Sequence, residues 1–200
     1  RYTANFQMNR RVFIVAACNY GLARYRWEED SLTRFRLFAA TPRTCGDGSQ
    51  SQAFLQNLAQ VSDAMINGGG DVLVMGQLDG RAWRVGLRDP RQPERLLGSV
   101  SLQRGFVAAS GDYERFVMHQ GKRLHHVLDP KTGYPTQGPH GVALIGEQLD
   151  AINGLGTAIM VAGAQAGRER LARTPGVDAL IVDADNSLWL SPGMARRLQR

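Results

Sequence analysis

The sequence predicts an α+β fold, with mixed or antiparallel sheets and helices packed against them. Two observations carry this prediction. Short apolar or alternating runs, separated by turn residues, recur between residues 72 and 145, as is typical of strands joined by tight connections. The small apolar residues gather in one stretch, 154–166, which suits a buried helix. Because strands and helices are segregated, regular βαβ winding is not expected.

The first quarter of the chain is less regular. Residues 12–18 form an apolar run of strand length, so we expect a strand there. The segment 21–32 is polar with two aromatic side chains, and we expect it to be helical rather than extended. Residues 41–52 have the composition of a loop, and 53–59 are expected to end a helix.

Alternating and apolar runs dominate the rest of the chain. Strands are expected over 72–76, 83–87, 97–102, 105–109, 141–145, 179–183 and 187–190. The segments 97–102 and 105–109 are close enough to form either a hairpin or a sheet corner. Residues 116–127 are expected to form a hairpin with Gly121 in its turn, because glycine accepts the positive φ angles of tight turns.

Composition excludes several classes of protein. The 200 residues are 43% hydrophobic and 21% charged, as in ordinary globular proteins, and no apolar run reaches the roughly 18 residues that a membrane-spanning helix needs. The net charge of +6 fits an anionic ligand, but the basic residues are scattered, and a nucleic-acid partner is therefore not expected. Cys18 and Cys45 stand alone, without the spacing of a zinc site, although one disulfide remains open.

Two glycine-containing segments are candidates for ligand contact. Gly68, Gly69 and Gly70 precede Asp71, and their lack of side chains would let the backbone approach a sugar or phosphate group. The alternative is a tight turn that leads into the next strand. The stretch 110–114, Ser-Gly-Asp-Tyr-Glu, follows a predicted strand in the same way and is open to the same two interpretations.

The densest group of reactive residues is 125–136, which begins with two adjacent histidines and continues through an Asp-Pro turn and a Thr-Gly step. Neighbours on a strand point to opposite faces, so only one of His125 and His126 can face a given site. A neutral imidazole there could act as a general base for a hydroxyl nucleophile. The alternative is a structural histidine.

Asn153 and Thr157 form a third candidate. If both lie on the predicted helix, their spacing of four places them on one face. Their oxygens would suit a hard cation such as Mg²⁺. The alternative is that Asn153 caps the helix, whose small residues then serve close packing.

Together these motifs resemble the ApbE family of flavin transferases. The segment His126–Pro135 is close to the family signature H-I-[IL]-D-P-[RK]-T-G-Y-P. The other similar segments are Asn67–Asp71, Trp83–Pro90 and Ser110–Glu114, with weaker likeness at Met8–Asn9 and Asp30–Phe35.

The resemblance implies a phosphoryl-transfer reaction. Family members bind FAD, use Mg²⁺ to cleave its pyrophosphate, and transfer FMN to a Thr or Ser hydroxyl of a target protein, whereas some hydrolyse FAD instead. The match gives His126 the role of catalytic base, and Asn153 and Thr157 the places of the metal-binding pair. The implied cofactor-binding residues are Met8, Gly69, Gly70, Asp71, Ser110, Gly111, Leu128, Asp129 and Thr132.

The chain departs from the family pattern in two ways. Asn153 stands where the family has a metal-binding Asp. The central D-[LI]-G-x-[IV]-A-K-G motif is absent, so we expect one ApbE-like domain over residues 1–200 with a segment missing near 40–60. The alternatives are a catalytically impaired FAD-binding accessory paralogue and an FAD pyrophosphatase that releases FMN and AMP. The family also implies a periplasmic or membrane-tethered protein, with a cytoplasmic one as the alternative.

Overall fold

The computed structural model describes residues 2–6, 11–16, 19–28, 31–40, 49–58, 63–68, 70–92 and 94–200. The predicted cofactor residues Met8 and Gly69 lie outside the described residues, as do both cysteines. The chain divides into two compact units, one of residues 1–64 with 75–81 and the other of residues 65–74 with 82–200. Each unit is described separately below.

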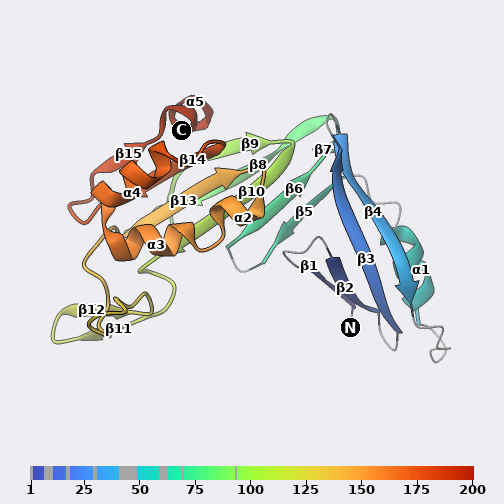
Figure 1. The fold of residues 1–200 in the computed structure, drawn as a ribbon, viewed down its shortest axis with the longest axis horizontal. Coiled ribbons are helices and arrows are strands. Elements are labelled where there is room, and N and C mark those ends of the chain that lie inside the picture. The colour runs from blue at the N-terminus through green and yellow to red at the C-terminus, as the bar shows by residue number, and fades with distance from the viewer. Residues whose placement is uncertain are drawn as a thin grey trace. The chain divides into compact units, whose positions relative to one another are not determined.

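The first unit is built on a four-stranded antiparallel meander (Figure 1). Its elements are β1 (Tyr2–Phe6), β2 (Arg11–Ala16), β3 (Asn19–Glu28), β4 (Ser31–Ala40), α1 (Ser51–Leu58) and the short β7 (Gln77–Leu78). The buried side-chain amide of Asn19 donates to the hydroxyl of Ser51 at 3.0 Å, which attaches the first residue of α1 to the start of β3.

The expectation of a helix over 21–32 is wrong. These residues belong mainly to β3, which pairs antiparallel with β2 and with β4. Tyr25 and Trp27 both lie within β3, whose register with β4 shifts between Arg26 and Glu28. Aromatic residues are enriched in strands, and the polar composition of this segment does not by itself distinguish a helix from a strand.

The second unit contains a six-stranded sheet with the strand order β15-β14-β13-β10-β6-β5. Its strands are β5 (Ala64–Asn67), β6 (Val72–Met75), β10 (Arg104–Gly111), β13 (Gly141–Gly146), β14 (Val177–Val182) and β15 (Leu188–Leu190). The four strands from β10 to β15 pair antiparallel. All six residues of β13 are buried, because layers cover both faces of the sheet.

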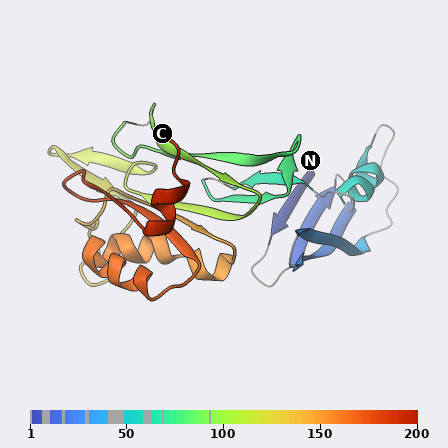
Figure 2. The ribbon, with the colours of Figure 1, turned by 90° about the horizontal axis from the view of Figure 1, so that it is seen from above.

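Helices cover one face of this sheet, and β8 (Arg81–Arg88) with β9 (Leu96–Leu102) covers the other (Figures 1 and 2). The helices on the first face are α2 (Leu149–Ile152), α3 (Leu155–Ala162) and α4 (Ala164–Ala172). The short α5 (Pro192–Arg197) lies on the other face, where Met194 joins the core that β8 and β9 form. Valine and leucine side chains of β8 and β9 pack against apolar side chains of β6, β10, β13 and β14 to form the core. No helix among the described residues is long and apolar enough to cross a membrane.

Most other expected elements are present. β9 and β10 lie in different sheets, so the connection between them is a sheet corner. The predicted hairpin is formed by β11 (Phe116–His119) and β12 (Lys122–His125), with Gly121 at φ +73° in its turn. The helix expected over 154–166 is divided into α3 and α4, because Gly163 adopts φ +90°, which an α-helix cannot accommodate.

Candidate functional site

The end of β10 brings three of the predicted site residues together. The carboxylate of Asp71 accepts a hydrogen bond from the backbone N–H of Ala109 at 3.3 Å. The hydroxyl oxygens of Ser110 and Thr157 lie 3.3 Å apart. This approach depends on Gly156, since a Cβ there would lie only 2.8 Å from Ser110 Oγ. Asp71, Ser110 and Thr157 therefore converge from three separate segments.

The glycine segment before Asp71 forms a closed turn. Gly68 donates its N–H to the carbonyl of Asp71 at 2.8 Å, and Gly70 donates to the side chain of Asn67 at 2.9 Å. Gly70 has φ +112°, a conformation that L side chains rarely adopt. The turn places Asp71 directly before β6, where its carboxylate reaches β10.

Gly111 and Tyr113 shape the neighbouring surface. A Cβ at Gly111 would overlap the Tyr113 ring, so glycine is needed for the ring to lie against the strand end. Burial raises the pKa of the Tyr113 phenol, and the negative charge of Glu114 raises it further, against the opposing effect of Arg88.

A cavity of about 520 Å³ opens between the six-stranded sheet and β8–β9. Gly70 and Ser110, two of the predicted cofactor-binding residues, contribute to its lining. The polar lining also includes Asn67, Arg88, Tyr113 and Glu114, and the apolar lining includes Val72, Leu87, Val107, Leu180 and Val182. Apolar side chains together with polar groups that can orient a ligand are what small-molecule sites require.

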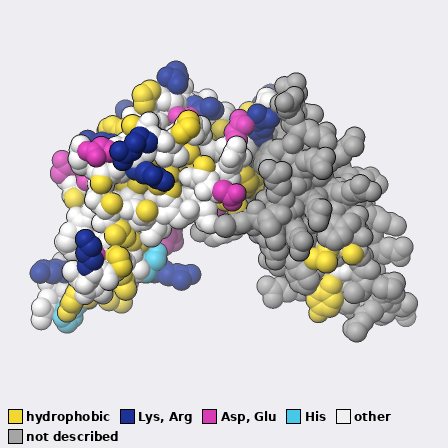
Figure 3. All heavy atoms as spheres, in the orientation of Figure 1, with side chains coloured by type: hydrophobic (Ala, Val, Ile, Leu, Met, Phe, Trp, Pro, Cys, Tyr) yellow, Lys and Arg dark blue, Asp and Glu magenta, His cyan; other side chains and the backbone are white. Residues whose placement is uncertain are grey.

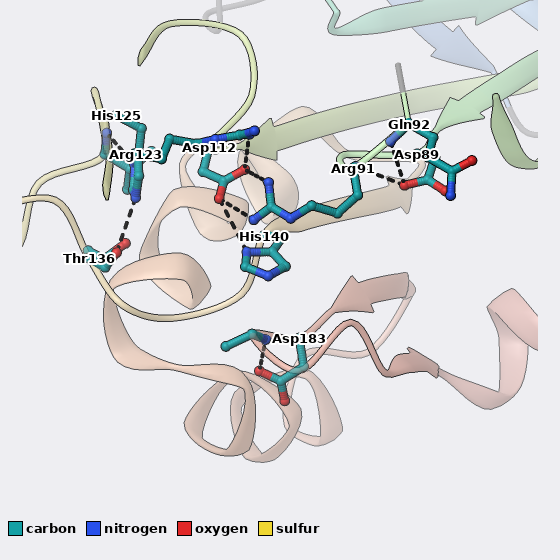
Figure 4. Close-up of polar contacts among 11 residues, drawn as sticks. Asp89, Arg91, Gln92, Asp112, Arg123, His125, Thr136, His140 and Asp183 are labelled. Atoms are coloured by element: carbon teal, nitrogen blue, oxygen red, sulfur yellow. Dashed lines mark hydrogen bonds and ion pairs between the residues drawn. The ribbon is translucent and has the colours of Figure 1, made fainter. Parts of the chain in front are cut away.

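Asp112 is the centre of a cluster of ionisable side chains (Figure 4). It is only 5% exposed, and its two carboxylate oxygens accept from both terminal nitrogens of Arg91, at 3.1 and 2.6 Å. Arg123 Nη1 lies 3.4 Å and His140 Nδ1 lies 3.2 Å from the same carboxylate. The contact between Arg91 and Asp112 is bidentate, which is the strongest hydrogen-bonding geometry between an arginine and a carboxylate. The cluster ties the end of β10 to β12 and to the segment that enters β13.

The two adjacent histidines differ as strand alternation predicts. His125 is buried, with Nε2 lying 3.1 Å from the carbonyl of Thr136 and Nδ1 accepting from Val127 N–H at 3.3 Å. Because a carbonyl oxygen only accepts, Nε2 of His125 carries the proton and both nitrogens are engaged. His125 is therefore structural.

His126 is exposed and has one ring nitrogen directed at the backbone. Its Nδ1 lies 3.3 Å from the carbonyl of Arg115, so the proton resides on Nδ1 and the lone pair on Nε2. The backbone N–H of His126 also donates to that carbonyl, at 3.1 Å. The ring is thus held in the tautomer that a general base at Nε2 requires.

The segment after His126 folds into a compact loop. The Asp129 carboxylate accepts from Lys131 N–H at 2.8 Å, and the Asp129 carbonyl accepts from Gly133 N–H at 2.8 Å. The Thr132 hydroxyl accepts from Tyr134 N–H at 3.2 Å. Leu128 and Pro135 form a bridge across the base of the loop. Asp129 and Thr132 therefore shape this loop through its own backbone.

The premise that placed Asn153 and Thr157 on one helix is wrong. Asn153 is the C-cap of α2 in an extended conformation, and Gly154 at φ +75° separates it from α3, which starts at Leu155. The capping alternative also fails, because Gly154 is the N-cap of α3. Gly154 lies in the left-handed region, so the helical periodicity that would place residues four apart on one face does not extend across it.

The side-chain oxygens of Asn153 and Thr157 are of the chemical type that Mg²⁺ binds. An amide and a hydroxyl oxygen are hard donors of the kind that this cation accepts. Both are neutral, and the described residues hold no group of three or more His, Cys, Asp or Glu that could bind a metal ion.

Sequence reasoning missed the cluster around Asp112. A usable signal was the position of Asp112, directly after Ser110 and Gly111 at the end of a predicted strand. Arg91, Arg123 and His140 carried no such signal, because they come from three other segments that only the folded chain brings together.

The fold and the site define an α+β protein with a polar cleft at a strand end and an exposed histidine that begins a compact loop. The sequence model of the ApbE family matches residues 49–181, and the chain belongs to this family. The predicted resemblance is thereby confirmed. A model of the META domain matches residues 1–89, which include the whole four-stranded meander and overlap the ApbE match over 49–89.

Individual relatives agree with this assignment. The chain is 36% identical over 143 residues to a protein of Rhodobacter capsulatus named FAD:protein FMN transferase, covering 70% of this chain and 27% of that protein. A protein of the same name from Klebsiella pneumoniae is 34% identical over 136 residues, covering 66% of this chain and 41% of that protein. The chain thus spans less than half the length of either relative.

A solved structure supports the fold. The crystal structure of the ApbE protein of Thermotoga maritima superposes with a TM-score of 0.65 at 30% identity, covering 76% of this chain and 50% of that one. The predicted α+β fold class is confirmed. The expectation of one ApbE-like domain over residues 1–200, with a segment missing near 40–60, stays a prediction.

Proposed function

We propose that this protein transfers FMN from FAD to a Ser or Thr hydroxyl of a target protein, with Mg²⁺ as the cofactor. The observation that carries the proposal is the exposed imidazole of His126, whose Nδ1 faces the Arg115 carbonyl at 3.3 Å. The names of the two relatives support the same reaction.

In the proposed reaction, the acceptor hydroxyl oxygen attacks the phosphorus of the FMN half of FAD. The bond from that phosphorus to the oxygen of the AMP half breaks, and AMP leaves. Nε2 of His126 takes the hydroxyl proton. Ser110 and Gly70, with Asp71 beside them, would line the binding site for FAD. Asp129 and Thr132 would shape the loop next to its phosphates, and Leu128 lies at the base of that loop.

Asn153 and Thr157 are the residues that would hold Mg²⁺. When bound, the cation supplies positive charge that offsets the negative charge of the pyrophosphate oxygens. Because both residues are neutral, we expect the affinity for Mg²⁺ to be low without FAD and higher with it.

The test combines FAD, Mg²⁺ and a Thr-containing acceptor, with covalent flavin detected by its fluorescence in a denaturing gel. We expect His126→Ala to abolish transfer while FAD still binds, as measured by calorimetry. Transfer by His126→Ala at the wild-type rate would remove His126 from the mechanism.

The neutral Asn153 favours a second candidate, an FAD-binding accessory protein without activity. FAD binding that is tight and independent of Mg²⁺, with no transfer, would support it. A pyrophosphatase is the other alternative, and quantitative release of FMN and AMP from FAD alone would establish it against the transferase.

A further inference from the structure

The hairpin of β11 and β12 exposes apolar side chains beside the candidate base. It forms a two-stranded sheet of its own and extends past the end of α3 in Figure 1. Val117 is 63% and Leu128 is 49% exposed. Exposed apolar side chains that gather on one face, with polar residues around them, mark a candidate contact surface.

Register and burial divide the hairpin into two faces. Val117 lies opposite Leu124, and the hydrogen bond from His126 N–H to the Arg115 carbonyl continues the same pairing by one position. Side chains directly opposite each other share a face. His125 and Val127 are buried, whereas His126 and Leu128 are exposed, so alternate positions point toward the protein body and away from it.

We define the outward hairpin face as the side chains that share the face of His126. They are Arg115, Val117, His119, Lys122, Leu124, His126 and Leu128. The opposite face carries Arg123, whose guanidinium contacts Asp112, and Met118. The candidate base thus lies on the same face as three apolar side chains.

The outward hairpin face is basic. Arg115 and Lys122 are exposed, and no carboxylate belongs to the face. The nearby Glu114 pairs with Arg88 at 3.1 Å, and the Asp129 carboxylate accepts from the backbone of its own loop. Figure 3 shows hydrophobic, basic and histidine side chains gathered over this projecting end of the second unit.

We propose that the outward hairpin face is the docking surface for the acceptor polypeptide, which binds as an extended segment with apolar side chains and carboxylates next to its Ser or Thr. This proposal rests on the proposed function. The acceptor oxygen must come within about 3 Å of His126 Nε2. Extended chain advances roughly 3.3–3.6 Å per residue, so residues two to four positions from that hydroxyl can reach the neighbouring side chains of the same face, whose diagonal spacing in a sheet is roughly 7–8 Å.

Two adjacent residues provide the test and its control. Val117 and Met118 lie on the same strand with nearly equal exposure but on opposite faces. The probe is a library of short peptides with one central Thr, in which the flanking positions are Asp, Lys, Val or Ala. We expect Val117→Ser to raise the KM for the best peptide about ten-fold, with FAD affinity and kcat unchanged. Met118→Ser should keep the wild-type KM.

Charge is tested separately. The wild-type protein should prefer peptides with Asp beside the Thr, and Lys122→Glu should shift that preference toward Lys. Arg173→Glu, the same charge reversal at the exposed end of α4, should leave the preference unchanged.

The outcomes separate the two proposals. A wild-type protein that transfers FMN, but whose KM responds equally to Val117→Ser and Met118→Ser, overturns the docking surface alone. A wild-type protein that modifies no peptide and no protein acceptor overturns the proposed function, and the docking surface with it. A preference for Lys over Asp in the wild type overturns the acidic character assigned to the acceptor.

Discussion

Replacing Asp112 by alanine tests the energetic role of the ion cluster. The substitution removes a 5%-exposed carboxylate that lies within 3.4 Å of Arg91, Arg123 and His140. Breaking a buried ion pair by removing one partner costs roughly 3–5 kcal/mol. The Arg91 and Arg123 side chains keep 27% and 31% of their surface in water, which allows them to rehydrate.

We therefore expect the lower end of that range, a loss of about 3 kcal/mol in the free energy of unfolding. For a chain of this size, the melting temperature should fall by roughly 6–12 °C, at about 2–4 °C per kcal/mol. Urea unfolding followed by circular dichroism at pH 7 measures the first quantity, and a thermal scan measures the second.

Glu114→Gln is the matched control, because it removes one carboxylate from an ion pair with Arg88 whose two side chains are both exposed. Its cost should be below about 1 kcal/mol. If Asp112→Ala is no more destabilising than Glu114→Gln, the reasoning that burial makes the Asp112 cluster important for stability is refuted.

Three further predictions concern single residues. Gly156→Ala would place a Cβ 2.8 Å from Ser110 Oγ, so we expect a loss of about 1–3 kcal/mol in urea unfolding, and an unchanged stability would contradict the close packing. The pKa of Tyr113 is raised from its usual value of 10.0 in the folded state, so above pH 10 the unfolded chain loses this proton first and stability falls. Tyr113→Phe should reduce this fall in the free energy of unfolding between pH 9 and 11. Identical slopes of stability against pH in the two proteins would contradict the raised pKa of Tyr113. Asn153→Asp adds a charged oxygen, so Mg²⁺ affinity should rise about ten-fold by calorimetry, whereas no change would place the metal elsewhere.

Local patterns predicted much of the second unit. Strands such as β6, β8 and β13 were expected from apolar runs and alternation, and the structure has them within a few residues. The contrast between His125 and His126 also followed from alternation alone. These features depend on short-range periodicity, which a single sequence carries.

Features that depend on long-range contacts were not predictable in this way. The Asp112 cluster joins residues up to 49 positions apart, from Arg91 to His140, and no local pattern relates them. The separation of Asn153 from α3 depends on the left-handed conformation of Gly154. Glycine can also continue a helix, at a cost in stability, so its presence alone does not predict a break. The helix expected over 21–32 does not form, because β3 pairs with β2 and β4 and the composition of the segment does not specify these partners.

The division of the chain has a consequence for any attempt to separate its parts. The backbone passes from one unit to the other three times, after residues 64, 74 and 81, so no single cut releases either unit whole. Removal of residues 1–64 would take away Asp63, whose carboxylate accepts from Gln77 N–H at 2.6 Å, and would leave segment 75–81 without this partner. A functional fragment must therefore be designed with an internal deletion as well as a new terminus.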